Sequence, residues 1–155
     1  MLLIEDDSSA INLARSAVVE CFPEIDLAVV GGGDAALAWM NGCAENIRMP
    51  DIILLDLNLP KLDGLAVLRK LRIQADTRDI PIVAYSAEHT QADVLMSYQV
   101  GANSFVPKPA DLEQYKELFR ERLAYWMQLR ENVTVSADGD EVNRVDFAHS
   151  AALKR

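Results

Sequence analysis

The sequence predicts an α/β protein whose parallel β-sheet carries helices on both faces. Short apolar runs alternate five times with amphipathic stretches before about residue 130, as in strands that are joined by crossover helices. The apolar runs are nearly continuous, which is typical of strands buried on both faces of a parallel sheet. Several runs end in charged or polar residues, at the sheet edge where open α/β sheets bind their ligands.

The first predicted strand covers residues 1–5, and helical spacing of apolar residues predicts a helix over 8–21. Asp7 or Ser8 is the expected N-cap, because a short polar side chain at that position accepts a hydrogen bond from the first helical turn. Pro23 marks the exit of this helix.

A second strand over 25–30 precedes the turn Gly31–Gly33 and a helix over 35–47, for which Asp34 is the expected N-cap. A glycine run between a strand and a helix invites comparison with phosphate-binding loops. This run lacks the spacing of those motifs. We therefore interpret it as a tight turn.

The third strand is predicted over 51–56, and Asp63–Gly64 opens the third helix. The residues of this helix that should face the core are Leu65, Leu68 and Leu71. The fourth strand, Ile82–Tyr85, follows Pro81, since proline is tolerated where a strand begins.

The fourth helix is predicted over 88–100 and ends at Gly101, which suits a left-handed C-terminal cap. The fifth strand covers 104–106, and the fifth helix covers 112–130, about 30 Å at 1.5 Å per residue. Five such units with right-handed crossovers fit a flavodoxin-like, doubly wound sheet in the order 2-1-3-4-5.

Composition and charge narrow the domain organisation and the function. We expect one domain over residues 1–130 and a flexible or partly docked C-terminal extension over 131–155, where no period persists. The net charge of −9 argues against nucleic-acid binding. With no transmembrane-length apolar run and no signal peptide, we expect no membrane contact and a cytoplasmic protein. Cys21 and Cys43 lack metal or redox spacing and are interpreted as buried or half-buried thiols in a reducing compartment.

Complementary polar side chains follow four of the predicted strands. They are Glu5, Asp6, Asp56, Ser86 and Lys108. A carboxylate such as Asp56 is a competent nucleophile toward a phosphoryl group, and clustered carboxylates are suitable Mg²⁺ ligands. Lys108 offers a positive charge for a phosphate oxygen or for Asp56. Ser86 and the backbone N–H of Ala87 would donate hydrogen bonds to the phosphoryl group.

Each of these residues alone has an ordinary explanation. A lone acid at a strand end is usually a helix cap or a solvated loop residue, and Asp7 fits that description better than a site. Lys108 alone would be a surface lysine, but its place between Pro107 and Pro109 constrains its backbone. Complementary groups at four strand ends favour a site over coincidence.

These motifs together resemble the receiver domain of two-component response regulators. The matching segments are Leu3–Asp7, Leu54–Pro60, Asp63–Gly64, Ser86–Ala87, Gly101–Ala102 and Lys108–Pro109. The resemblance implies that a sensor histidine kinase phosphorylates Asp56. It also implies that Glu5 and Asp6 form an acid pair, and that Asp6, Asp56 and the carbonyl of Asn58 bind Mg²⁺.

The same resemblance implies that Ser86 is the switch hydroxyl and that Lys108 is the family's invariant lysine, followed by a cis peptide bond to Pro109. Phe105 stands at the aromatic switch position and should turn inward when Ser86 moves. The side formed by the fourth helix, fifth strand and fifth helix would then shift between two populations.

A narrower resemblance concerns the stand-alone regulators that pair with bacterial and cyanobacterial phytochromes. It rests on Asp56–Pro60, Ser97–Phe105 and Tyr125–Trp126. This resemblance implies a phytochrome-like kinase as partner and a homodimer through the side formed by the fourth helix, fifth strand and fifth helix.

Aromatic and apolar residues cover more of the predicted fifth helix than one core face requires. They are Leu112, Tyr115, Leu118, Phe119, Leu123, Tyr125, Trp126 and Leu129. One interpretation is a core stripe with the tryptophan lying on the C-terminal extension. The other, which we favour, is a homodimer interface that includes Tyr125 and Trp126.

The sequence thus predicts a single-domain response regulator that performs phosphotransfer and autodephosphorylation only at its own Asp56 and signals through protein contacts. A phosphatase would need a second acid at position 58, which is Asn58. A receiver-like module that binds partners without phosphorylation remains the alternative, although the full set of site residues argues against it. The missing phosphate-binding loop and few aromatics disfavour a flavodoxin-like cofactor binder.

Overall fold

The computed structural model describes residues 1–46 and 48–126. Its five strands are parallel and form one sheet in the order β2-β1-β3-β4-β5. The strands are β1 (Leu2–Ile4), β2 (Ala28–Val30), β3 (Ile53–Asp56), β4 (Ile82–Ser86) and β5 (Ser104–Pro107). The predicted flavodoxin-like fold and its strand order are confirmed.

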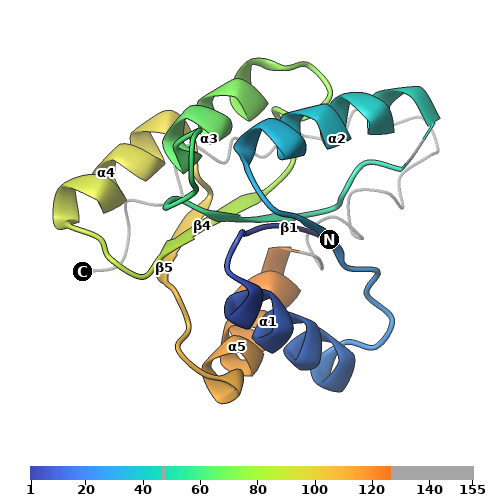
Figure 1. The fold of residues 1–155 in the computed structure, drawn as a ribbon, viewed down its shortest axis with the longest axis vertical. Coiled ribbons are helices and arrows are strands. Elements are labelled where there is room, and N and C mark those ends of the chain that lie inside the picture. The colour runs from blue at the N-terminus through green and yellow to red at the C-terminus, as the bar shows by residue number, and fades with distance from the viewer. Residues whose placement is uncertain (47, 127–155) are drawn as a thin grey trace, which may run out of the picture.

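Helices cover both faces of this sheet (Figure 1). The helices are α1 (Ser8–Cys21), α2 (Gly33–Asn46), α3 (Gly64–Ile73), α4 (Gln91–Val100) and α5 (Leu112–Leu118). α1 and α5 pack together on one face, and α2, α3 and α4 cover the other. Successive strand residues point to opposite faces. On β4, Ala84 therefore joins the core under α2–α4, whereas Val83 and Tyr85 join the core under α1 and α5.

Side-chain caps mark the start of α1 and of α4. The Asp7 carboxylate accepts a hydrogen bond from the first turn of α1 over 2.8 Å, as predicted. Asp34 was predicted to precede its helix, but it lies inside the first turn of α2. The predicted start of α4 is also wrong. This helix begins only at Gln91, because Thr90 and Asp93 form a reciprocal capping box.

The fifth helix departs from regular α-helical geometry. α5 ends at Leu118, and Phe119–Leu123 forms a π-helical turn, η1, which a 3.6-residue period does not reveal. Residues 127–130, the 131–155 extension and the side chain of Cys43 lie outside the described part of the chain. Cys21 is a half-buried free thiol, as predicted.

Two further observations concern the described residues. None of their helices combines the length and the apolar character that crossing a membrane requires. The resemblance implies a cis Lys108–Pro109 bond. This prediction is wrong, since every peptide bond within residues 1–46 and 48–126 is trans. Trans is the form that bonds before proline favour by about 0.5–1 kcal/mol.

Candidate functional site

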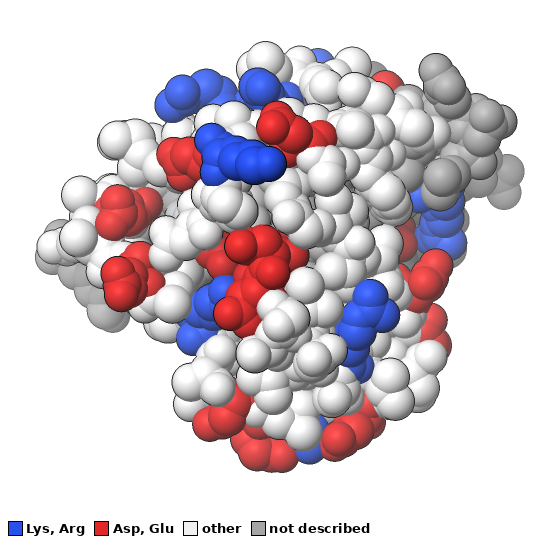
Figure 2. Space-filling view, in the orientation of Figure 1, with Lys and Arg blue, Asp and Glu red and all other residues white. Residues whose placement is uncertain are grey.

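The polar residues predicted at the strand ends meet at one edge of the sheet. Asp56 ends β3 and Ser86 ends the adjacent β4, while Glu5 directly follows β1. Acidic side chains gather near the centre of the face shown in Figure 2. Gly64 lets α3 approach this edge closely, because a Cβ atom there would lie 2.5 Å from the Asp56 carbonyl oxygen.

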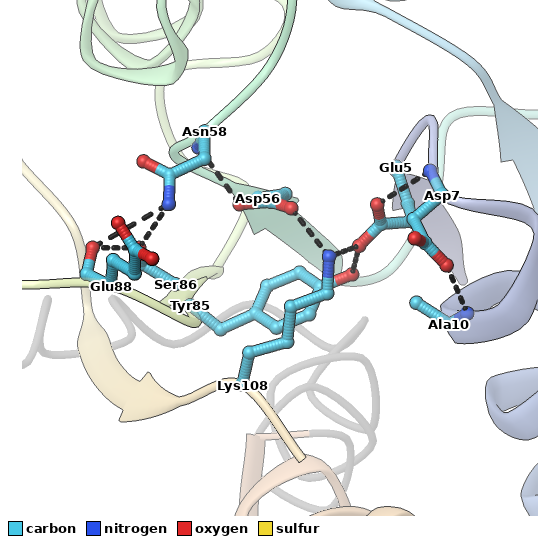
Figure 3. A network of polar contacts seen from close by, with 9 residues as sticks. All are labelled: Glu5, Asp7, Ala10, Asp56, Asn58, Tyr85, Ser86, Glu88 and Lys108. Atoms are coloured by element: carbon cyan, nitrogen blue, oxygen red, sulfur yellow. Dashed lines mark hydrogen bonds and ion pairs between the residues drawn. The ribbon is translucent and has the colours of Figure 1, made fainter. Parts of the chain in front are cut away.

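Lys108 joins two of the acids. Its Nζ atom lies 2.8 Å from Asp56 Oδ2 and 2.7 Å from Glu5 Oε2 (Figure 3). Burial opposes the charged form of Lys108, but its hydrogen bonds to Asp56 and Glu5 outweigh that penalty and raise the pKa of Lys108 above its ordinary value. The lysine therefore stays protonated and compensates part of the carboxylate charge.

Glu5, Asp6 and Asp56 form a cluster suited to a divalent cation. One oxygen from each carboxylate can be chosen so that all three lie within 4.8 Å of one another. Three carboxylates and one ammonium leave two negative charges uncompensated. Carboxylate oxygens are hard ligands of the kind that Mg²⁺ and Mn²⁺ take. Asp6 is exposed, whereas Glu5 and Asp56 are buried.

Glu5 is held by donors on both of its oxygens. The backbone N–H of Asp7 donates to Oε1 over 2.9 Å, while Lys108 and the Tyr85 hydroxyl contact Oε2. The sequence predicts Tyr85 only as a strand residue. The available signal was a tyrosine at the end of an otherwise aliphatic strand, because a buried phenol usually requires a hydrogen-bond partner.

Asn58 connects Asp56 to Ser86. Its backbone N–H donates to Asp56 Oδ1 over 2.8 Å, and its side-chain Nδ2 donates to Ser86 Oγ over 2.8 Å. The Ser86 hydroxyl in turn donates to the Glu88 carbonyl over 2.6 Å (Figure 3). Ser86 is thus hydrogen-bonded both to its own loop and to the loop that follows β3. Ala87 follows it as an exposed residue.

The predicted switch aromatic lies beside this loop. Phe105 is half-buried, and its ring makes an edge contact with His89 at 5.0 Å between centroids. The backbone N–H of Phe105 donates to the Tyr98 hydroxyl of α4 over 3.1 Å. Phe105 therefore contacts both α4 and the loop that follows Ser86.

The two predicted interface residues line a groove between α4, β5 and the end of the last helix. The groove has a volume of about 760 Å³. Its lining residues are Tyr98, Asn103, Ser104, Glu121, Arg122, Tyr125 and Trp126. Tyr125 is 56% exposed. Trp126 is half-buried and also packs against the core under α1 and α5.

Comparison with known proteins identifies the family. Residues 1–120 match the family model of the response regulator receiver domain. The chain is 32% identical over 139 residues to the response regulator Rcp1 of Synechocystis sp., which covers 88% of this chain and 92% of that protein.

Solved structures of related proteins show the same fold. The phosphorylated cyanobacterial phytochrome response regulator RcpA has 31% identity and a TM-score of 0.75, covering 83% of this chain and 93% of that one. The Mn²⁺-bound form of Rcp1 has 31% identity and a TM-score of 0.69, covering 82% and 93%. The bacteriophytochrome response regulator AtBRR has 33% identity and a TM-score of 0.63, covering 77% and 88%.

Proposed function

Because this chain belongs to the response regulator receiver family, we propose that it accepts a phosphoryl group on Asp56 from a histidine kinase. The observation that carries the proposal is the placement of Asp56. Its carboxylate is held by Lys108 and the Asn58 N–H, and it lies within the Glu5–Asp6 acid cluster at the ligand-binding edge of the sheet.

Asp56 would be the nucleophile. One of its carboxylate oxygens attacks the phosphorus of a phosphohistidine, the new O–P bond forms as the P–N bond breaks, and the histidine nitrogen leaves with the electron pair and takes a proton from solvent. The pair of oxygens is already oriented by Lys108 and the Asn58 N–H. Such positioning is a large part of what phosphoryl transfer requires.

Glu5, Asp6, Asp56 and the backbone carbonyl of Asn58 would hold Mg²⁺. When bound there, the ion would neutralise negative charge on the acids and the phosphoryl oxygens. Its ligand atoms are the hard oxygens that this ion takes. A clustered set of acids with two uncompensated charges gives the site a reason to bind a cation.

Lys108, Ser86 and Ala87 would stabilise the phosphorylated state. Lys108 would contact a phosphoryl oxygen, and the Ser86 hydroxyl and the Ala87 N–H would donate to the others. For this the Ser86 hydroxyl must leave the Glu88 carbonyl and the Asn58 amide. Phe105 would follow by turning inward, which changes the surface formed by α4, β5 and α5.

The output would be a changed protein contact on that surface. Likeness to the phytochrome response regulators supports a phytochrome-like histidine kinase as the phosphoryl donor. The groove lined by Tyr125 and Trp126 supports a homodimer on this side. In sedimentation velocity, Trp126→Ala should shift a dimer toward monomer, and an unchanged sedimentation coefficient would contradict the dimer.

The test of the phosphoacceptor is intact-mass spectrometry after incubation with acetyl phosphate and Mg²⁺. The native chain should gain one phosphoryl group, and Asp56→Asn should gain none. Asp7→Asn is the matched control, because asparagine also caps a helix and leaves α1 intact; this variant should gain the group. No gain in any variant would favour the alternative, a receiver-like module that binds partners without phosphorylation.

A further inference from the structure

Tyr85 of β4 places its hydroxyl inside the acid site. Its side chain is fully buried among the core residues under α1 and α5. From there the hydroxyl donates to Glu5 Oε2, the same oxygen that contacts Lys108 (Figure 3). The Lys108 Nζ atom also lies 5.6 Å from the centroid of the Tyr85 ring.

Glu5 depends on its protein donors because solvent does not reach it. The residue is 0% exposed, and a buried carboxylate is costly unless its oxygens are hydrogen-bonded. The Asp7 N–H contacts one oxygen, and Tyr85 and Lys108 share the other. Tyr85 is thus one of two side chains that determine where Glu5 Oε2 lies.

We propose that Tyr85 is a positioning residue of this site, which holds Glu5, and through Glu5 the Lys108 ammonium, in the arrangement that binds a divalent cation. The proposal rests on the function proposed above. Lys108 lies almost equally far from Glu5 and Asp56, at 2.7 and 2.8 Å. Without the Tyr85 hydroxyl, Glu5 has one donor fewer and draws the ammonium toward itself and away from Asp56.

Tyr115 of α5 offers a matched control within the same core. Its side chain is also 0% exposed. Its hydroxyl lies near that of Tyr85, but no described residue makes a hydrogen bond of good geometry with it. Replacing either tyrosine by phenylalanine removes only its hydroxyl oxygen. Only at Tyr85 does that atom contact an acid of the site.

The experiment is a Mn²⁺ titration by calorimetry on the native chain, Tyr85→Phe and Tyr115→Phe, at a temperature where circular dichroism shows all three folded. Loss of a hydrogen bond that orients a metal-binding carboxylate typically weakens metal affinity 10–100-fold. We expect the Kd of Tyr85→Phe to rise about tenfold and that of Tyr115→Phe to stay within about twofold. A purely structural role for Tyr85 would lower the melting temperature and leave the Kd unchanged.

The outcomes separate this inference from the proposed function. If the native chain accepts a phosphoryl group and Tyr85→Phe binds Mn²⁺ like the native chain, the positioning role is refuted and the function stands. Equal weakening by both phenylalanine variants also refutes it, since the effect would then belong to the core. If the native chain neither binds Mn²⁺ nor gains a phosphoryl group, both proposals fail.

Discussion

Arg72 of α3 forms hydrogen bonds at the edge of the sheet where β4 and β5 begin, opposite the edge that carries the site. Its guanidinium donates to the carbonyls of Gly101 over 2.7 Å and Ile80 over 2.8 Å, and to Asn103 Oδ1 over 2.7 Å. It therefore ties α3 to the end of α4 and to the chain segments that lead into β4 and β5. Burial lowers the pKa of Arg72 to about 10, because the guanidinium is partly removed from water.

We predict that Arg72→Ala lowers the free energy of unfolding by about 3 kcal/mol. The substitution leaves the Gly101 and Ile80 carbonyls without their side-chain donor, at about 1–3 kcal/mol for each group that water does not reach. The relief from burying a charged guanidinium offsets part of this loss. Gly101 sits at φ 117°, and a Cβ atom there would lie 3.0 Å from Arg72 Cγ, so the Arg72 side chain packs closely against this glycine.

The assay is urea unfolding followed by far-ultraviolet circular dichroism. Arg72→Lys should recover less than half of the loss, because an ammonium cannot reproduce the planar fork of donors. Arg69→Ala, an exposed arginine on the same helix, should change stability by less than about 0.5 kcal/mol. A loss below about 1 kcal/mol for Arg72→Ala would refute the reasoning, since it would mean that water replaces the guanidinium at no cost.

Three further predictions concern the site. Burial raises the pKa of Tyr85, so above about pH 10 the unfolded chain loses a proton that the folded chain keeps, and stability falls as pH rises; the raised pKa of Lys108 acts in the same direction. In urea unfolding at several pH values, Tyr85→Phe should show a shallower alkaline loss by about 1.4 kcal/mol per pH unit, and an identical slope would contradict this. At 10-fold excess over its Kd, Mg²⁺ should stabilise the native chain by about 1.4 kcal/mol but leave the melting temperature of Asp56→Asn unchanged; equal stabilisation of both would place the ion elsewhere. Gly64→Ala should slow phosphorylation by acetyl phosphate, because its Cβ atom would lie 2.5 Å from the Asp56 carbonyl oxygen, and a native rate would show that α3 shifts without moving Asp56.

Much of the fold could be predicted because local patterns and tertiary packing agree. Strands buried on both faces are necessarily apolar runs, and the crossover rule then leaves few strand orders. The start of α1 followed from Asp7, which acts within its own helical turn. The start of α4 was missed because Thr90 and Asp93 cap each other, a pattern that the apolar spacing does not report. The π-helical turn η1 departs from the period on which the helix prediction relied.

Site residues that directly follow a strand could be predicted from the sequence. A contact that forms only when separate strands pair in the sheet could not. Glu5, Asp56 and Lys108 were singled out from sequence, and the structure brings them into contact. Tyr85 was overlooked because its strand position predicts only burial. That its hydroxyl reaches Glu5 follows from the pairing of β1, β3 and β4, which no local pattern encodes.

The hydrogen bonds around Ser86 allow the free-energy cost of the proposed switch to be approximated. Before phosphorylation, the hydroxyl is engaged by Asn58 and the Glu88 carbonyl, and the Phe105 backbone is engaged by Tyr98. At about 1 kcal/mol net for each, breaking these three bonds costs about 3 kcal/mol, which keeps the switched arrangement below about 1% of molecules. New hydrogen bonds to a phosphoryl group contribute about 1.5–3 kcal/mol each. Two of them, from Ser86 and the Ala87 N–H, contribute about 3–6 kcal/mol, which offsets or exceeds that cost. The proposed modification of Asp56 would then change the α4, β5 and α5 surface without unfolding any element.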